Sequence, residues 1–304
     1  MTPAISIILP VHNRADVLGR AIRSVLDQTL KDWELIAVDD GSTDGSVGVA
    51  KSFADPRIKI IELGENRGGN AARNAGVRAA GAPLIAFLDS DDTYLPEKLE
   101  RVAAEFERRP KLDLLIDSFV KIQPSGARVT HRNPVIVDRA TFRKALFQRQ
   151  LWKATPSITV KRDAALRAPF DETLRRLQDF DFLIRVSEFA SCASTDQVLW
   201  VKYWDAGAIS AQDNMIPANI ELVRRHPEYL SVREYRPGLA YILRLSLWRR
   251  LKKGDPAGIL RDIRNLKSAF GPREATRLLL EAAKPRPRLG CFHTMIPENY
   301  IFRL

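Results

Sequence analysis

The sequence is poor in cysteine and has no long apolar run, and each shortage excludes a class of protein. Its 304 residues include two cysteines, Cys192 and Cys291, which are far apart and form no CxxC pair. We therefore expect no disulfide framework and no thiolate zinc site, and a reducing compartment such as the cytoplasm fits. No stretch reaches the ~18 uncharged apolar residues of a membrane span, and the first residues do not resemble a signal peptide.

Three common ligand-binding motifs are also absent. The glycine-containing stretch at 66–76 is neither a GxGxxG motif nor a P-loop, so NAD binding and ATP hydrolysis lose support. The acidic loop at 39–45 partly mimics a calcium loop, but Lys51 occupies the position where an EF-hand needs its twelfth-position glutamate. A nucleotide site, if present, must therefore be built in another way.

Positive charge is concentrated in the C-terminal part of the chain. Residues 221–304 hold 18 Lys and Arg against 8 Asp and Glu, whereas residues 1–220 hold 30 against 29. Such a basic part can meet nucleic acid, anionic lipid or a phosphorylated acceptor, and a solvated helical surface explains it equally well. Because it lacks the aromatic pattern of single-strand binders and any DNA-reading motif, we expect no nucleic-acid partner.

Short β-rich runs alternate with helical patterns in the first third of the chain. We predict strands at 5–9, 33–38, 58–63 and 84–88, and helices at 16–30, 44–53, 70–80 and 96–109. This alternation is typical of an α/β fold with a mostly parallel sheet flanked by helices. Ligands of such sheets bind at the carboxyl ends of the strands. The pattern is mixed from about 112 to 205 and all-helical after about 215, which predicts a helical C-terminal extension.

The strongest chemical signal is an apolar strand, 84–88, that is followed at once by Asp89, Asp91 and Asp92. Clustered carboxylates repel one another, so a folded protein usually keeps such a cluster for a cation. A hard ion such as Mg²⁺ or Mn²⁺ takes one or two carboxylates and completes its shell with water and diphosphate oxygens. The alternative is a solvated turn before the next helix.

Three other polar clusters follow predicted strands or begin predicted helices. Asp39 and Asp40 end the second strand, where a carboxylate can bind a ribose hydroxyl or a base N–H. Arg73 lies in the stretch 66–76, where it could contact a base or a phosphate. Asp179 is near the start of a helix, a place that favours negative charge. Each cluster also has an explanation without a ligand. Turn chemistry explains the first, packing of small helix residues against the sheet explains the second, and the preference for acids at a helix start explains the third, so the alternatives stay open.

Taken together, these stretches resemble glycosyltransferase family 2, whose members invert the sugar configuration and have the GT-A fold. The resemblance rests on SIILPVHN at 6–13, VDDGS at 38–42, ARNAG at 72–76, FLDSDD at 87–92 and QDFD at 178–181. It covers about residues 3–205. Two positions depart from the family pattern, because His12 replaces a frequent Tyr and Gln178 replaces a frequent Glu.

The resemblance implies a role for each matching residue. It makes Asp179 the catalytic base, and Asp89 and Asp91 the metal pair for Mg²⁺ or Mn²⁺. The donor-binding set is Pro10, Val11, Asn13, Arg14, Asp39, Asp40, Arg73, Asp89, Ser90 and Asp91. Acceptor contacts are predicted by position alone at Trp152, Thr155, Ser157 and Asp181.

The implied protein is a metal-dependent inverting hexosyltransferase of cell-surface polysaccharide synthesis. It takes a sugar from a nucleotide donor, most often UDP, to a hydroxyl of a saccharide or lipid-linked acceptor. We expect a GT-A domain at 1–215, with a nucleotide-binding half at 1–110 and an acceptor-binding half at 111–215, and an extension at 216–304. The extension suits the inner membrane face or a homo-oligomer interface. The alternatives are an inactive nucleotide-sugar-binding protein and a nucleic-acid-binding protein.

Overall fold

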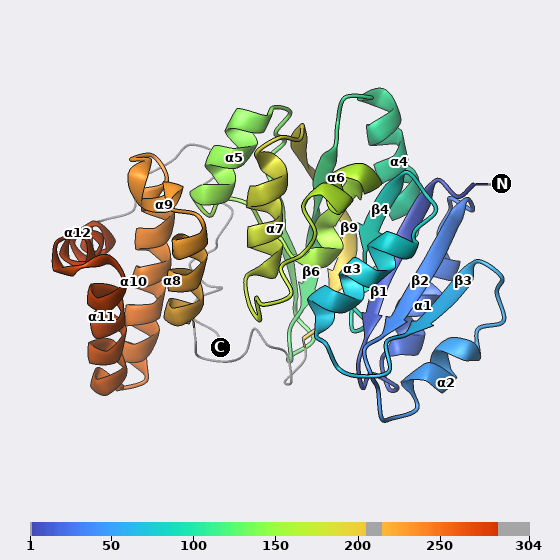
Figure 1. Cartoon of the computed structure of the whole chain (residues 1–304), viewed down its shortest axis with the longest axis horizontal. Helices are drawn as coiled ribbons and strands as arrows, with labels where there is room; N and C mark the ends of the chain where they lie inside the picture. The colour runs from blue at the N-terminus through green and yellow to red at the C-terminus, as the bar shows by residue number, and fades with distance from the viewer. Residues whose placement is uncertain (1, 205–214, 285–304) are drawn as a thin grey trace. The chain divides into compact units, whose positions relative to one another are not determined.

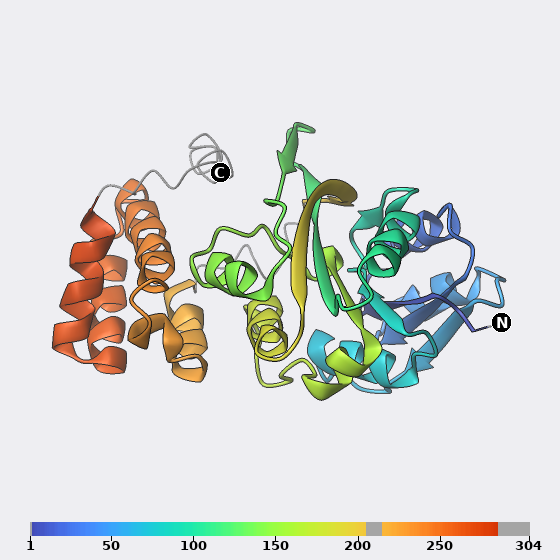
Figure 2. The same cartoon turned by 90° about the horizontal axis from the view of Figure 1, so that it is seen from above.

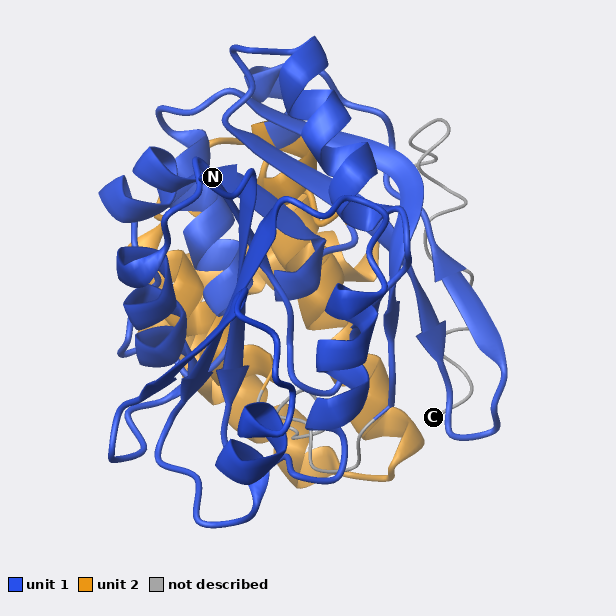
Figure 3. Ribbon diagram, turned by 90° about the vertical axis from the view of Figure 1, so that its right-hand side faces the viewer, with its two compact units in different colours: residues 1–142, 152–206 blue, residues 143–151, 207–304 orange. Residues whose placement is uncertain are grey.

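The computed structural model describes residues 2–204 and 215–284. The chain divides into two compact units, residues 1–142 with 152–206 and residues 143–151 with 207–304, coloured separately in Figure 3. The short segment 143–151 thus belongs with the C-terminal helices, although it lies inside the first unit in sequence. The domain boundary at 215 and the division of the first domain at 110 stay predictions.

The first unit is built on one sheet, which has nine strands within the described residues. In chain order they are β1 (Ile5–Val11), β2 (Trp33–Asp39), β3 (Ile58–Glu62), β4 (Leu84–Phe87), β5 (Thr93–Tyr94), β6 (Leu114–Ile122), β7 (Arg128–His131), β8 (Ile158–Lys161) and β9 (Cys192–Lys202). Their order across the sheet is β3-β2-β1-β4-β8-β6-β9-β5, and β7 pairs with β6. Six strands point one way, while β5, β7 and β8 run against them.

Helices cover both faces of this sheet, as Figures 1 and 2 show. The helices of the first unit are α1 (Leu18–Leu26), α2 (Ser46–Lys51), α3 (Gly69–Ala79), α4 (Lys98–Arg108), α6 (Arg162–Arg167) and α7 (Gln178–Ser187). A single 3-10 turn, η1 (Thr155–Ser157), precedes β8, and helix α5 (Arg139–Phe147) leads into the segment 143–151. The predicted helix-flanked, mostly parallel sheet is therefore confirmed.

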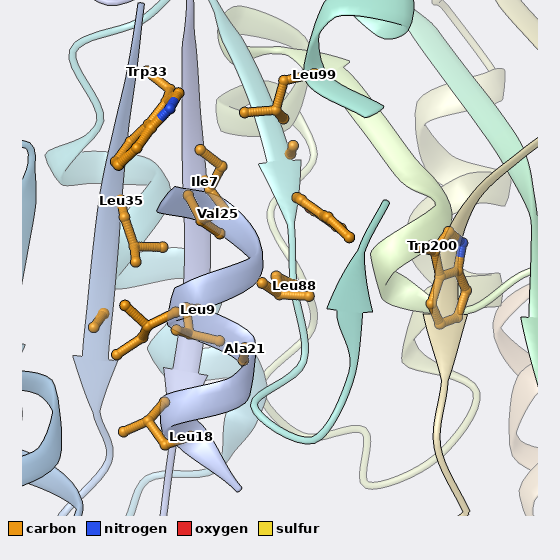
Figure 4. Packing of buried hydrophobic residues seen from close by; sticks show 14 of the residues in the cluster. Ile7, Leu9, Leu18, Ala21, Val25, Trp33, Leu35, Leu88, Leu99 and Trp200 are labelled. Atoms are coloured by element: carbon orange, nitrogen blue, oxygen red, sulfur yellow. The ribbon is translucent and has the colours of Figure 1, made fainter. Parts of the chain in front are cut away.

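Strand β1 explains why helices pack on both faces. Successive side chains of a strand point to opposite faces, so Ile7 and Leu9 share one face while Ile8 lies on the other. Ile7 and Leu9 pack with the apolar side of α1, including Val25, in the core shown in Figure 4. On the other face, Gly76 of α3 lies so close to Ile8 that an added Cβ would be 2.5 Å from its Cγ2. Both faces of β1 are consequently buried, which fits its run of apolar residues, interrupted only by Ser6.

The second unit is helical in its described residues. It contains α8 (Met215–Arg225), α9 (Glu228–Ser231), α10 (Arg236–Lys252), α11 (Pro256–Phe270) and α12 (Pro272–Ala283). Helices α10, α11 and α12 pack side by side, and buried Arg250 binds Asp262 and Asp255 at 2.6 and 2.7 Å. The predicted helical extension is confirmed. Within residues 2–204 and 215–284, no helix combines the length and apolarity that crossing a lipid bilayer requires.

Candidate active site

The carboxyl ends of β1 and β2 form the first wall of the site. These strands are parallel neighbours, and the register pairs Val11 with Asp39. Asn13 ties the two following loops together, because its N–H donates to Ser42 Oγ at 3.0 Å and its Oδ1 accepts from Thr43 N–H at 2.8 Å. Asn13 has a φ of 52°, a left-handed conformation that asparagine tolerates better than most residues. The predicted donor residues at 10–14 and 39 therefore lie together.

Asp39 carries an acceptor that no described residue satisfies. The carboxylate is buried, and Oδ2 accepts the N–H of Ser42 at 3.1 Å. Its Oδ1 is also buried but has no hydrogen-bond partner among the residues that the structure describes. Leaving a buried acceptor unpaired costs about 1–3 kcal/mol, which a ligand N–H would recover. The two groups predicted for this carboxylate, a ribose hydroxyl and a base N–H, are both donors of this kind, and the contact stays a prediction.

Asp40 has a different environment from its neighbour. Its Oδ1 accepts from Arg67 N–H at 2.7 Å and its Oδ2 from Gly68 N–H at 2.8 Å, so both oxygens hold the loop before α3. The ring of His12 continues this network. Its Nδ1 donates to the Asp40 carbonyl at 2.8 Å, and Nε2 accepts from Asn66 at 2.8 Å. The structure thus gives Asp40 and His12 loop-holding contacts, and direct donor contact by Asp40 stays a prediction.

The acidic residues after β4 differ sharply in their surroundings. Asp89 forms an ion pair with buried Arg73 at 2.8 Å. Asp92 is fully buried, and its Oδ1 accepts from Tyr203 N–H at 3.0 Å. Burial, followed by Asp89, raises the pKa of Asp91, and no other described residue donates a hydrogen bond to its carboxylate. Ser90 is buried between these acids in the chain.

This environment fits a divalent cation that is shared with a ligand. A cation beside Asp91 would relieve both causes of its raised pKa, burial and the charge of Asp89. The described residues hold no group of three or more histidine, cysteine or acidic side chains arranged to bind an ion. Mg²⁺ and Mn²⁺ commonly take only one or two carboxylates when substrate phosphates supply further oxygens. Asp91, with Asp89 beside it, would hold such an ion.

Aromatic packing fixes α7 against the end of β4. Phe182 of α7 stacks on Phe170 with ring centroids 4.3 Å apart, and Phe170 meets Phe87 of β4 edge-on at 5.3 Å. Two asparagines of α3 hold the chain that leads into α7. Asn74 Nδ2 donates to the Phe170 carbonyl at 2.8 Å, and Asn70 Nδ2 donates to the Asp171 and Leu174 carbonyls. These contacts bring the start of α7 to the same edge of the sheet (Figure 1).

Asp179 and Asp181 lie in the first turn of α7 but have different partners. Leu177, which precedes the helix, has a left-handed φ of 57°, and Asp179 is only partly buried. Its Oδ1 accepts the N–H of Phe180 at 2.9 Å. Asp181 is buried, and its Oδ2 binds Arg185 one turn later at 2.7 Å. The predicted acceptor contact of Asp181 therefore competes with an internal ion pair and stays a prediction.

The ammonium group of Lys202 lies close to the acidic residues that follow β4. Lys202, the last residue of β9, is buried enough to lower its pKa, but carboxylates outweigh this effect and raise it. They are, in decreasing influence, Asp92, Asp89, Asp91 and Asp179. Acids that follow β4 and an acid of α7 therefore all favour the charged form of Lys202.

The predicted acceptor residues at 152–157 are unequally placed. Trp152 is partly exposed and meets His131 edge-on at 4.3 Å. Thr155 and Ser157 are buried, and Ser157 Oγ accepts from the Trp200 indole at 3.2 Å. The ammonium of Lys153 lies 3.1 Å from the ring centroid of Phe180, which brings this segment to the residue beside Asp179. Of the three, Trp152 is the one that is not buried, and acceptor contact by all three stays a prediction.

Several residues of the site escaped the sequence analysis. The sequence offers only one hint of Lys202, which is that this polar residue ends an apolar strand. Asn70 and Asn74 are four residues apart on α3, a spacing that places them on one helix face and could have marked them. Arg20 was missed too. It donates to the Asp91 carbonyl at 2.7 Å and covers the ring of Tyr203 at 3.6 Å.

A comparison with known protein families identifies the family of this chain. Residues 6–173, more than half of the chain, match the profile of Glycosyl transferase family 2. The chain belongs to this family. The stretch that carries the match includes the ends of β1, β2 and β4, and it ends just before α7.

Several known proteins are similar to this chain in sequence. The chain is 42% identical over 100 residues to "Succinoglycan biosynthesis protein ExoO" of Rhizobium meliloti, covering 33% of this chain and 29% of that protein. It is 42% identical over 101 residues to "Putative teichuronic acid biosynthesis glycosyltransferase TuaG" of Bacillus subtilis, covering 33% of this chain and 40% of that protein. With WfgD of Escherichia coli, named "UDP-Glc:alpha-D-GlcNAc-diphosphoundecaprenol beta-1,3-glucosyltransferase", it shares 28% identity over 177 residues, 58% of this chain and 66% of that protein. The matches thus span about a third to two thirds of these relatives.

Two solved structures share the fold. S. aureus TarS 1-349 in complex with UDP-GlcNAc has a TM-score of 0.65 and 17% identity, covering 90% of this chain and 83% of that one. Mannosyltransferase PcManGT of Pyrobaculum calidifontis, in complex with GDP-Man and Mn²⁺, has a TM-score of 0.60 and 15% identity, covering 93% and 80%. The predicted GT-A fold is therefore confirmed for this chain.

Proposed function

We propose that this protein is a metal-dependent inverting glycosyltransferase that moves a sugar from a UDP donor to a hydroxyl of a saccharide or lipid-linked acceptor. The observation that carries the proposal is that Phe170 and Phe182 pack on Phe87 and so hold the start of α7 against β4. Asp89 and Asp91 follow β4, and Asp179 lies in the first turn of α7. A metal-binding pair and a carboxylate base at one edge of the sheet suit a single displacement at an anomeric carbon.

The donor would be held by the ends of β1, β2 and β4. The unpaired Oδ1 of Asp39 suits the N–H of a uracil ring, because it is the acceptor in this wall that lacks a donor among the described residues. Arg73 would contribute to donor binding indirectly, because its ion pair at 2.8 Å holds Asp89 in place. The names of ExoO, TuaG and WfgD all refer to polysaccharide biosynthesis or a lipid-linked sugar acceptor, and they support cell-surface polysaccharide synthesis.

The proposed reaction has one step. Asp179 accepts the proton of the acceptor hydroxyl while that oxygen forms a bond to the anomeric carbon. The bond from this carbon to the diphosphate oxygen breaks, and its electron pair leaves with UDP. A bound divalent ion would supply charge stabilisation for the departing diphosphate. The configuration inverts because attack and departure occur on opposite faces of the sugar.

Replacing the base tests this mechanism. In Asp179→Asn we expect UDP affinity close to that of the parent protein and transfer lowered by about 10²- to 10⁴-fold, because the amide cannot accept the proton. Calorimetry measures UDP binding, and radiolabelled UDP-sugars with a panel of acceptors measure transfer. Asp163→Asn removes an exposed carboxylate of α6 and is the matched control, which should keep full activity.

Two outcomes would contradict the proposal. Near-normal transfer by Asp179→Asn would remove Asp179 from the chemistry. Binding of UDP by the parent protein without transfer or hydrolysis of any labelled donor would favour the inactive nucleotide-sugar-binding alternative. NMR of the product, read at the new anomeric centre, would test inversion.

The helical unit is proposed to lie at the cytoplasmic face of the inner membrane. Leu251, Leu260 and Leu280, on three different helices, are 66%, 55% and 63% exposed. Two arginines are also exposed: Arg249, two residues before Leu251, and Arg261, directly after Leu260. Exposed leucine with basic neighbours suits a surface of anionic lipid. The competing use of the same unit is a homo-oligomer interface.

Vesicle binding separates these two uses. We expect the full chain to sediment with phosphatidylcholine vesicles that contain phosphatidylglycerol and not with phosphatidylcholine alone. Changing both Leu251 and Leu260 to Ser should abolish sedimentation, while the control Leu166→Ser, on exposed α6, should not. Absence of sedimentation, together with a dimeric mass by light scattering, would favour the oligomer.

A further inference from the structure

Lys202 carries an ammonium group whose N–H donors find no acceptor among the described residues. It ends β9, which pairs with β5 in a register that sets Val201 opposite Thr93, so Lys202 lies beside the residue that follows Asp91. Its Nζ is 3.8 Å from Asp92 Oδ2, and its side chain is 29% exposed. Among the residues that the structure describes, its ammonium makes no hydrogen bond. Three N–H donors are thus held at the edge of the acidic cluster.

A second lysine of the same chain shows what a structural ion pair looks like. Lys98 is fully buried and donates a direct hydrogen bond to Asp117, which is also buried. Lys202 differs in both respects, because it reaches the surface and stays beyond hydrogen-bonding distance of Asp92. Asp92 uses its Oδ1 for the N–H of Tyr203 instead. Pairing with Asp92 alone therefore does not explain where Lys202 lies.

The charges around Lys202 point toward an anionic ligand. Without a nearby positive charge, the carboxylates of Asp89 and Asp91 would repel a diphosphate. This repulsion would act at the place where a metal ion would be bound by both the carboxylates and the diphosphate. An ammonium beside them offsets this repulsion, and it can donate directly to a phosphate oxygen. The ring of Tyr203, the next residue, is covered by the guanidinium of Arg20, which also donates to the Asp91 carbonyl. The backbone next to Lys202 is thereby tied to the backbone of the acidic loop.

We propose that Lys202 binds the diphosphate of the nucleotide donor and stabilises it as the leaving group, beside the metal ion. This rests on the proposed function and adds a protein cation to the same site. The consequence is that part of the diphosphate affinity does not depend on metal. A structural lysine would contribute nothing specific to the diphosphate.

The test compares uridine with UDP, which differ by the diphosphate. Calorimetry on the full chain, with and without Mn²⁺, gives both affinities for the parent protein, Lys202→Met and Lys202→Arg. We expect Lys202→Met to bind UDP about 10- to 100-fold more weakly in both conditions, the usual effect of losing a hydrogen bond to a charged group. Uridine affinity should not change, and Lys202→Arg should recover most of the UDP affinity.

Controls keep the two proposals distinguishable. Asp39→Asn should weaken uridine and UDP alike, which shows that the uridine measurement is sensitive. If the parent protein binds neither ligand, the UDP assignment of the proposed function fails, and this proposal fails with it. If the parent protein binds UDP more tightly than uridine and Lys202→Met retains that difference, only the role of Lys202 is refuted. If circular dichroism shows that Lys202→Met folds poorly, the double variant Lys202→Met with Asp92→Asn is measured instead. The second change removes the buried negative charge that the first change leaves without its lysine.

Discussion

His131 offers a pH-dependent test of how the core beneath the site is packed. It ends β7 and is almost fully buried, stacked on Phe119 at 4.6 Å and edge-on to Trp152 at 4.3 Å. Burial, and then the charge of Lys121, lowers the pKa of His131 from 6.5 to about 4. The native imidazole therefore stays neutral at pH values where an unfolded histidine is charged.

The sign and size of the effect follow from this difference. Above pH 6.5 the imidazole is neutral in both states and the full stability is present. As the pH falls toward 4, the histidine of the unfolded chain binds a proton that the native histidine does not bind. The free energy of unfolding therefore decreases. His131 accounts for a decrease in the free energy of unfolding of about 2 kcal/mol by pH 5, and of about 3 kcal/mol once the pH is well below 4.

The variant His131→Phe keeps an aromatic ring in the stack and removes the titrating group. Urea unfolding of both proteins between pH 7 and pH 4.5, followed by circular dichroism, gives the difference in unfolding free energy at each pH. Asp117, whose pKa burial raises to about 7, acts in the opposite direction because its native state gains a proton over this range. Since both proteins contain Asp117, its effect cancels in the difference. A difference that does not vary with pH would show that His131 is solvated or charged, and would refute the packing argument.

Two further changes test the packing of the sheet and the metal site. Gly76→Ala should destabilise the protein by about 1–3 kcal/mol in urea unfolding, because its Cβ would meet Ile8 Cγ2 at 2.5 Å. Gly48→Ala in α2, where nothing lies within 4 Å, is the matched control and should be neutral or stabilising. Asp91→Ala should remove the enhancement of UDP binding by Mn²⁺ in calorimetry while leaving metal-free binding in place, and an enhancement equal to that of the parent protein would exclude Asp91 as a ligand.

Much of the first half of the fold could be predicted because its signals are local. The predicted strand 33–38 and helix 70–80 agree with β2 (Trp33–Asp39) and α3 (Gly69–Ala79) to within one residue at each end. The strand-end acids could also be predicted as a group, since parallel strands deliver their carboxyl ends to one edge. What could not be predicted was the partner of each acid. Asp39 and Asp40 are adjacent and chemically identical, yet one keeps a free acceptor and the other holds a loop.

The sequence by itself determined the α/β order, the apolar strands and the acidic residues that follow them, because periodicity and composition act over a few residues. Only the tertiary structure decided which side chains meet. It brought Lys202 of β9 to 3.8 Å from Asp92, more than a hundred residues earlier, and it placed the N–H of Tyr203 on the same carboxylate. Such pairings depend on strand order and helix packing across the whole unit, and no local pattern in the chain encodes them.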